Sequence, residues 1–241
     1  QFLSVPTNTT QTVNQAWQEG QVPGTMVDVG GYGTQISTLY ASPTTLGFDF
    51  TSTVGHGMKA WDVGSQNYLP QPNTTSPVAS SRGYMLFVRG NRAQTGLAGS
   101  STTTLRTRGQ LFTGNQAAIA VPANQYVSVG NPYASALNMD NIPLTGMVQS
   151  FYVWDPKLAG SFGDGGFQTF TKIGANWVPS PGGGSYDVVS GSAVYDSSFI
   201  PSGHAFFVRG GAGASSISFD EGDKAADRHN ATRIQGQAQY I

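Results

Sequence analysis

The chain carries one eight-residue phrase twice: GYMLFVRG at residues 83–90 returns as GHAFFVRG at residues 203–210. Each copy opens on glycine, continues as a short apolar run and closes on Phe-Val-Arg-Gly. A short apolar run that ends at a glycine is typical of a buried β-strand. Because a repeated phrase indicates a repeated structural unit, the sequence predicts two β units built on one plan.

Two further features recur around this phrase in the same order. The strand-like stretch 2–6 resembles the stretch 126–130, and a Trp-Asp pair occurs at 61–62 and again at 154–155. Insertions change the spacing between these words but not their order. We interpret them as the trace of an internal duplication, with chance similarity between short strand-like words as the alternative.

The duplication predicts an all-β fold of two pseudo-repeated, β-sandwich-like units, the first at residues 1–110 and the second at residues 111–241. The two units could also pack together as one pseudo-symmetric domain. Composition supports strands over helices, because glutamate, which helix surfaces use heavily, occurs only at Glu19 and Glu221. Aromatic residues make up 11% of the chain, whereas disordered polypeptides are poor in them.

One or two short helices are expected between the strands. Residues 12–19 favour a helix with Thr9 or Thr10 as its N-cap and Gly20 as its stop. Its counterpart in the second unit is a predicted helical turn at 136–139.

Charge and composition exclude several classes of partner. Only 10% of the residues are charged and the net charge is −1, so the chain lacks the basic surface that nucleic acid requires. No apolar run approaches the length needed for membrane insertion. The absence of cysteine excludes thiol catalysis, cysteine-ligated metals and disulfides. Abundant Thr, Ser, Gly and Asn with little Lys and Glu suggest an exported bacterial protein, so we expect an extracellular or cell-surface location.

A set of words in fixed order carries a resemblance to known proteins. The words are FLSVPTN with AWQEG, GYMLFVRG, TTLRTRGQLFTGN, VSVGNPYAS, FYVWDP, and IPSGHAFFVRG with FDEGDK. Together they resemble a β-rich region of large surface and secreted proteins of Bacteroidota that use the type IX secretion system. The resemblance spans Phe2 to about Lys224 and implies export as part of a longer polypeptide. It transfers no catalytic residue and no ligand.

Arg89 and Arg209 occupy the same position in the two phrases, and Asp62 and Asp155 each follow a matching tryptophan. We predict that Arg89 pairs with Asp62, or Arg209 with Asp155, as structural ion pairs that fix the strand register. Binding of carboxylates or acidic sugars by the two arginines is the functional alternative. Recurring positions usually serve a recurring fold, which favours the structural interpretation.

Asp220, Glu221 and Asp223 place three carboxylates within four residues, and Ca²⁺ favours such oxygen clusters in loops. Their spacing does not match the Asp-x-Asp-x-Asp-Gly loop, and the same residues suit a solvated strand end. A Ca²⁺ site is therefore the minor hypothesis here, and no other cofactor or metal is expected.

The rings of Trp17, Trp61, Trp154 and Trp177 could form a sugar-stacking platform. Aromatic residues in a β fold more often belong to the core. The three histidines are scattered, without the spacing of a zinc site or a serine in a nucleophile-elbow turn. The sequence therefore predicts no catalytic residue and no enzymatic activity.

The favoured hypothesis is a non-enzymatic structural or adhesive module of an exported cell-surface protein. Its expected partners are the flanking domains of its own longer chain and copies of itself, since strand edges offer a physical route to assembly. The alternative is a carbohydrate-binding module, with glycans as partners, or an accessory domain of a secreted hydrolase.

Overall fold

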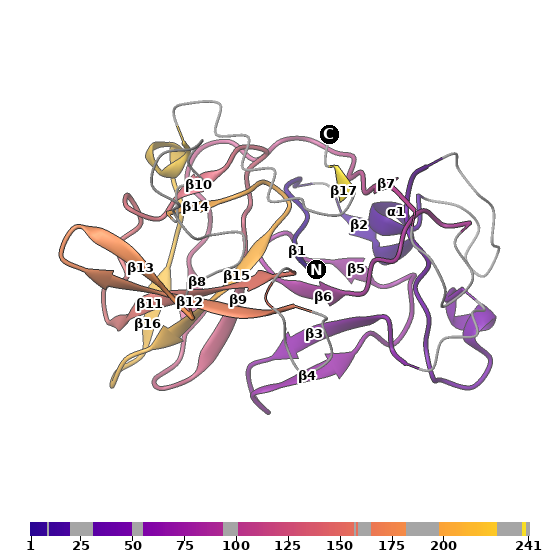
Figure 1. Cartoon of the computed structure of the whole chain (residues 1–241), viewed down its shortest axis with the longest axis horizontal. Coiled ribbons are helices and arrows are strands. Elements are labelled where there is room, and N and C mark those ends of the chain that lie inside the picture. Colours follow the sequence, from indigo (N-terminus) through magenta and orange to yellow (C-terminus); the bar gives the residue numbers. More distant parts are fainter. Residues whose placement is uncertain are drawn as a thin grey trace.

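The fold is all-β, as the sequence predicts, with two larger antiparallel sheets and several two-stranded ones (Figure 1). Helical structure in the described part of the chain is short: α1 (Val13–Trp17) and the 3-10 turns η1 (Pro43–Leu46) and η3 (Glu221–Asp223). This computed structural model describes residues 1–8, 10–19, 31–49, 55–93, 101–156, 158, 165–181, 198–225 and 238–239.

The first sheet has four antiparallel strands in the order β1-β6-β3-β4. These strands are β1 (Phe2–Leu3), β6 (Tyr84–Leu86), β3 (Met58–Asp62) and β4 (Asn67–Pro70). The second sheet has five, also antiparallel, in the order β13-β12-β11-β15-β9. They are β13 (Asn176–Ser180), β12 (Gly166–Ile173), β11 (Met147–Asp155), β15 (Ala205–Gly210) and β9 (Tyr126–Gly130).

The two sheets share one strand order, so the matching words of the sequence occupy matching places. In each sheet the strand of the repeated phrase lies between the strand of the first matching stretch, β1 or β9, and the strand that ends on Trp-Asp. A hairpin follows each Trp-Asp pair and places an aromatic ring against the tryptophan. Trp61 meets Tyr68 at 5.1 Å and 79°, and Trp154 meets Phe167 at 5.2 Å and 79°. This agreement supports the predicted duplication. Among the described strands, β13 has no equivalent in the first sheet.

The two copies of the phrase differ at their fourth apolar position. Phe207 is 5% exposed, whereas its counterpart Phe87 is 52% exposed. The cause is the length of the neighbouring strands: β15 runs between two long strands, while β6 has a two-residue neighbour, β1, and ends before Phe87. The two sheets therefore share their strand order but differ in the burial of this phenylalanine ring.

A layer of mainly aromatic side chains joins the two sheets, and we call it the aromatic layer. Its members are Phe2, Trp61, Tyr68 and Met85 from the first sheet and Tyr126, Tyr152, Trp154, Phe167, Ala205 and Phe207 from the second. Phe207 lies at its centre, stacked on Phe2 at 4.9 Å and edge-on to Trp61 at 5.0 Å. Strands β1 and β6 of one sheet and β9 and β15 of the other lie toward the middle of the molecule (Figure 1).

Each sheet packs its opposite face on a separate core, because side chains alternate along a strand. In β6, Leu86 enters the core of the first unit while Met85 enters the aromatic layer. In β15, Phe206 and Val208 enter the core of the second unit while Phe207 enters the aromatic layer. The result is β-sandwich-like, with two cores on the outside of a shared layer.

The glycine that opens the first phrase marks a close approach between the halves. A Cβ atom on Gly83 would lie 2.5 Å from the Phe2 ring and 2.7 Å from the Cβ of Ala205. Both distances are shorter than packed carbon atoms allow, so only glycine fits here. The backbone also connects the halves directly, since the Ser4 amide donates to the Gly203 carbonyl at 2.8 Å.

Four two-stranded sheets form the remaining regular structure of the described residues. Three of them are antiparallel: β2 (Gln11–Thr12) with β5 (Pro77–Val78), β8 (Ile119–Val121) with β16 (Ser215–Ile217), and β10 (Leu137–Asn138) with β14 (Phe199–Ile200). The last strand, β17 (Ala238–Gln239), pairs in parallel with β7 (Thr103–Thr104) of the first half. This pair, like the aromatic layer, therefore joins residues from the two sides of the predicted 110/111 boundary.

The predicted helices needed correction. The N-cap of α1 is Thr12, whose hydroxyl accepts from the Gln15 amide while the Gln15 side chain accepts from the Thr12 amide. Thr10 does not serve as the cap, because Gln11 and Thr12 first pair with β5 as strand β2. Thr9 and Gly20, which the sequence also proposed for the helix ends, lie outside the described residues. The predicted turn at 136–139 is wrong, since Leu137 and Asn138 form strand β10.

Substitution of Phe207 by alanine tests the aromatic layer. We expect F207A to lose about 3–5 kcal/mol of unfolding free energy, the usual cost of removing a buried phenylalanine. The matched control is F87A at the equivalent, exposed position, where we expect a change within about 0.5 kcal/mol. Urea denaturation followed by tryptophan fluorescence and by circular dichroism measures both. Equal effects of the two substitutions would contradict the assigned packing.

Candidate functional site

Arg209 does not pair with Asp155, because the strand register separates them. β11 and β15 are antiparallel with Val153 opposite Phe206, so Asp155 and Arg209 lie toward opposite ends of the pair. Arg209 instead lies over the ring of Tyr126, its neighbour on β9, at 5.4 Å. The predicted ion pair is wrong because the strand register keeps the two side chains apart, although their charges are opposite.

The same geometry separates Arg89 from Asp62. Ala60 lies opposite Tyr84, so the strand direction brings Asp62 toward Arg82 and away from Arg89. The hydroxyl and the amide of Ser65 each donate to Asp62 at 2.7 Å, and these bonds lower the pKa of the carboxyl, with a smaller contribution from Arg82. Asp62 therefore stabilises the turn between β3 and β4.

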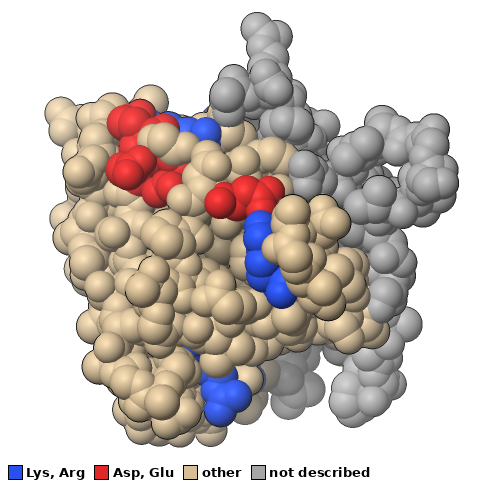
Figure 2. Space-filling view, turned by 90° about the vertical axis from the view of Figure 1, so that its left-hand side faces the viewer, with Lys and Arg blue, Asp and Glu red and all other residues tan. Residues whose placement is uncertain are grey.

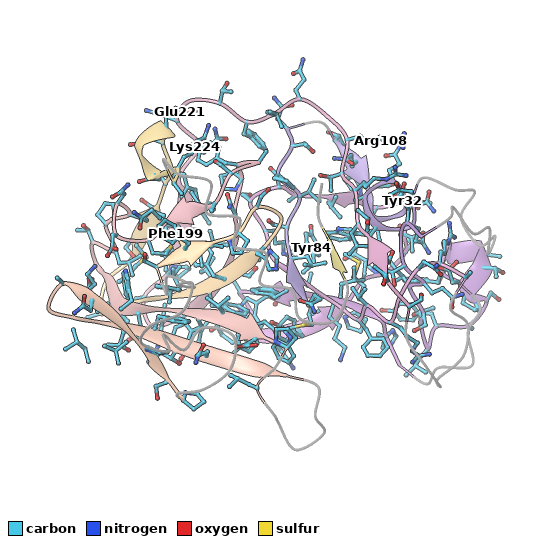
Figure 3. All side chains as sticks on the ribbon, turned by 45° about the horizontal axis from the view of Figure 1, so that its top comes forward. Tyr32, Tyr84, Arg108, Phe199, Glu221 and Lys224 are labelled. Atoms are coloured by element: carbon cyan, nitrogen blue, oxygen red, sulfur yellow. The ribbon has the colours of Figure 1, made fainter. Side chains whose placement is uncertain are left out.

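The three carboxylates at 220–223 stabilise their own 3-10 turn. Asp220 accepts from the Gly222 amide at 2.7 Å, and Asp223 accepts from the Asp220 amide at 2.8 Å. Glu221 forms an ion pair with Lys224 at 2.6 Å, which lowers the pKa of Glu221 (Figure 3). In the part of the chain that is described, no three acidic or histidine side chains come together as a cation site would require. This segment is a capping motif.

The four tryptophans do not form a sugar-stacking platform. Trp17 is 1% exposed in the first core and Trp177 is 7% exposed in the second. Trp61 and Trp154 are partly buried in the aromatic layer, and the Trp61 indole donates to the Tyr126 carbonyl at 2.9 Å. Their rings serve packing, so any carbohydrate site must use other residues.

A fully buried ion pair, which the sequence analysis missed, supports the first unit. Arg92 and Asp49 have no exposed side-chain surface and are joined at 2.8 Å. Arg92 also donates to the Gln18 carbonyl at 2.8 Å, and Asp49 accepts from the Gln18 side chain at 2.7 Å and the Ile36 amide at 3.0 Å. The network ties the end of α1 to two distant segments. A buried charge that loses its partner lowers the stability of the fold, so the network favours this arrangement of α1 and the two segments.

A second missed group lies at the border of the aromatic layer, and we call it the Arg209 cluster: Arg209, Tyr126 and Tyr152. The rings of Tyr126 and Tyr152 meet edge-on at 5.3 Å. Burial raises the pKa of Tyr152 to about 12, Tyr126 adds to the rise and Arg209 opposes it. The three side chains come from adjacent strands β9, β15 and β11, so only the sheet brings them together.

Hydroxyl groups continue the sheet face beside this cluster. Tyr152 lies opposite Thr169 on β12, and Thr169 lies opposite Ser180 on β13. In the next row, Thr171 hydrogen-bonds to Ser150 through their hydroxyls at 3.0 Å. Figure 2 shows the side of the molecule that lies on the left in Figure 1, where charged side chains are few and gathered in small groups.

Comparisons with known proteins give no match from which a function could be assigned. No protein-family model matches the chain, and no curated protein or solved structure matches it. Within the described ranges, no helix has the length and apolar character needed to cross a membrane.

Removal of the buried arginine tests the ion-pair network. We expect R92M to lose about 3–5 kcal/mol of unfolding free energy, because it leaves the Asp49 charge buried and uncompensated. As the control, K224M breaks the partly exposed pair with Glu221 and should cost at most about 1 kcal/mol. Thermal and urea unfolding measure both. If R92M is no more destabilising than K224M, the network does not have the assigned role.

Alkaline titration tests the environment of Tyr152. Its pKa is raised in the folded state, to about 12, so folding favours the neutral phenol. The stabilisation is present below the ordinary tyrosine pKa of about 10 and is lost as the pH rises from there toward 12. We expect Y152F to reduce the pH dependence of unfolding free energy in this window by up to about one proton. An unchanged slope would place Tyr152 in solvent.

Proposed function

We propose that this chain is a non-enzymatic structural and adhesive module of an exported cell-surface protein. It acts as a rigid block that holds its flanking domains apart and presents a sheet face to the surroundings. The support comes from how the side chains of this fold are used.

The observation that carries the proposal is the aromatic layer. Phe207 contacts Phe2 and Trp61 of the other half, so residues from both halves form one packed unit. Large aromatic residues contribute strongly to burial, and a layer of this kind resists separation of the sheets. A spacer must transmit force without opening between its parts, and this packing suits that task.

The strand edges define how copies of the module could interact. Each sheet has two outer strands: β1 and β4 in the first, β9 and β13 in the second. Two of the four, β4 and β13, contain a proline, Pro70 and Pro179 respectively. Proline lacks the amide donor that an added strand would need, so natural edges use it to limit pairing. Strand-to-strand assembly through β4 and β13 is therefore disfavoured, and we propose contacts through the sheet face as the route to adhesion.

Chemical composition supports an extracellular setting. The chain is rich in Thr, Ser, Gly and Asn and poor in Lys and Glu, which is the composition expected of an exported protein. The ordered words that resemble surface proteins of Bacteroidota agree with such a location. Because the four tryptophans are packed, the alternative of a carbohydrate-binding module depends on the Arg209 cluster.

Single-molecule force measurement tests the proposed role. The module, placed between two marker domains of known unfolding length, should unfold in one step that releases both sheets together, because they share the aromatic layer. F207A should keep the single step but lower the force. Two separate steps, or extension of the chain without resistance, would reject a rigid spacer.

A further inference from the structure

We propose that the Arg209 cluster binds the carboxylate of an acidic polysaccharide, one built from uronic-acid residues. This inference deepens the adhesive part of the proposed function by naming a ligand class and the site that takes it. It rests on the contacts of one guanidinium and on the chemistry of the sheet face around it.

The charge of Arg209 has no counter-charge in the described part of the chain. The ion pairs there involve Arg92, Arg106, Lys172 and Lys224, and each of these cations meets a carboxylate. Arg209 meets the Tyr126 ring instead. Attraction by a ring face is weaker than pairing with a carboxylate, so this guanidinium keeps its capacity to bind an anion.

The guanidinium is also held in a fixed place and left open at its tip. Its Nε atom is enclosed by protein and lacks an acceptor. Among the described residues, the two Nη nitrogens donate no hydrogen bond, and unlike Nε they are not among the buried atoms that lack a partner, so they can receive a ligand. An arginine that is already positioned loses little conformational freedom on binding, and its paired N–H groups match the two oxygens of a carboxylate.

The surroundings favour a sugar over other anions. Partly exposed Tyr152 and Thr169 and exposed Ser180 follow one another across the sheet, and Val178 and Ile173 expose apolar surface on the outer hairpin. Hydroxyls, ring edges and small apolar patches match the hydroxyls and C–H faces of a pyranose. Nucleic acid would require several cations to neutralise its phosphates. A single cation beside hydroxyls suits a chain with one carboxylate per sugar, where many weak contacts add up.

The repeated phrase supplies a matched control. Arg89 is the counterpart of Arg209, but it follows β6 and lies over the exposed ring of Phe87 at 5.3 Å. Arg89 lies outside the five-stranded sheet, whose described residues supply the tyrosine pair and the hydroxyl rows beside Arg209. Removal of one charge at either position changes the net charge equally, so a difference between the two variants reports on the site itself.

The experiment is affinity electrophoresis and calorimetry with polygalacturonate, using its fully methyl-esterified form as the uncharged probe. We expect the unmodified protein to bind the acid form and not the ester. R209Q should weaken binding about tenfold or more, the cost of losing a charged hydrogen-bonded pair, while R89Q stays within about twofold. Y152F, which keeps the ring and removes the hydroxyl, should weaken binding by about three- to tenfold.

Three results would overturn the inference: no binding of polygalacturonate, equal binding of its ester, or equal losses in R209Q and R89Q. Circular dichroism and thermal unfolding of each variant separate loss of binding from loss of fold, and Y152F provides a second, milder probe. If the protein fails to bind but unfolds under force in one step, the ligand inference fails and the spacer function stands. If it binds but unfolds in two steps, the reverse holds.

Discussion

Contact between aromatic side chains of two sheets is the interaction on which this structure depends. Phe207 stacks on Phe2 at 4.9 Å and meets Trp61 edge-on, so the second half of the chain inserts its repeated phrase against the first half. Each sheet keeps its own core on the opposite face, so the two sheets share one layer and still have separate cores. The close approach at Gly83, where a Cβ atom would collide with Phe2, shows how tightly this contact is fitted.

This use of aromatic residues determines what the surface can do. The four tryptophan rings pack inside the protein instead of forming a sugar-stacking platform, and the carboxylates at 220–223 cap a turn. The groups that remain for a binding function lie at the border of the aromatic layer, where the five-stranded sheet extends beyond the four-stranded sheet. Arg209 lies over the Tyr126 ring, and none of the ion pairs among the described residues includes it. The aromatic layer therefore both joins the two sheets and holds Tyr126, the ring over which Arg209 lies.

The sequence predicts the all-β fold and the order of the matching words, because apolar runs and glycine stops are local signals. It does not predict which residues face each other. Arg209 and Asp155 are wrongly paired since antiparallel register, set by the whole sheet, decides their distance. The pair of Arg92 and Asp49 joins positions 43 residues apart and leaves no local pattern. The difference between Phe87 and Phe207 likewise depends on the lengths of neighbouring strands rather than on the phrase itself.

The most direct test of the central claim is a double-mutant cycle between Phe2 and Phe207, one ring from each half. Unfolding free energies of F2L, F207L and the double variant give the interaction energy between the two rings. The account predicts a favourable coupling of about 0.5–1.5 kcal/mol, as expected for a stacked aromatic pair. Additive effects, with no coupling between the two substitutions, would show that the halves do not depend on this contact and would contradict the account.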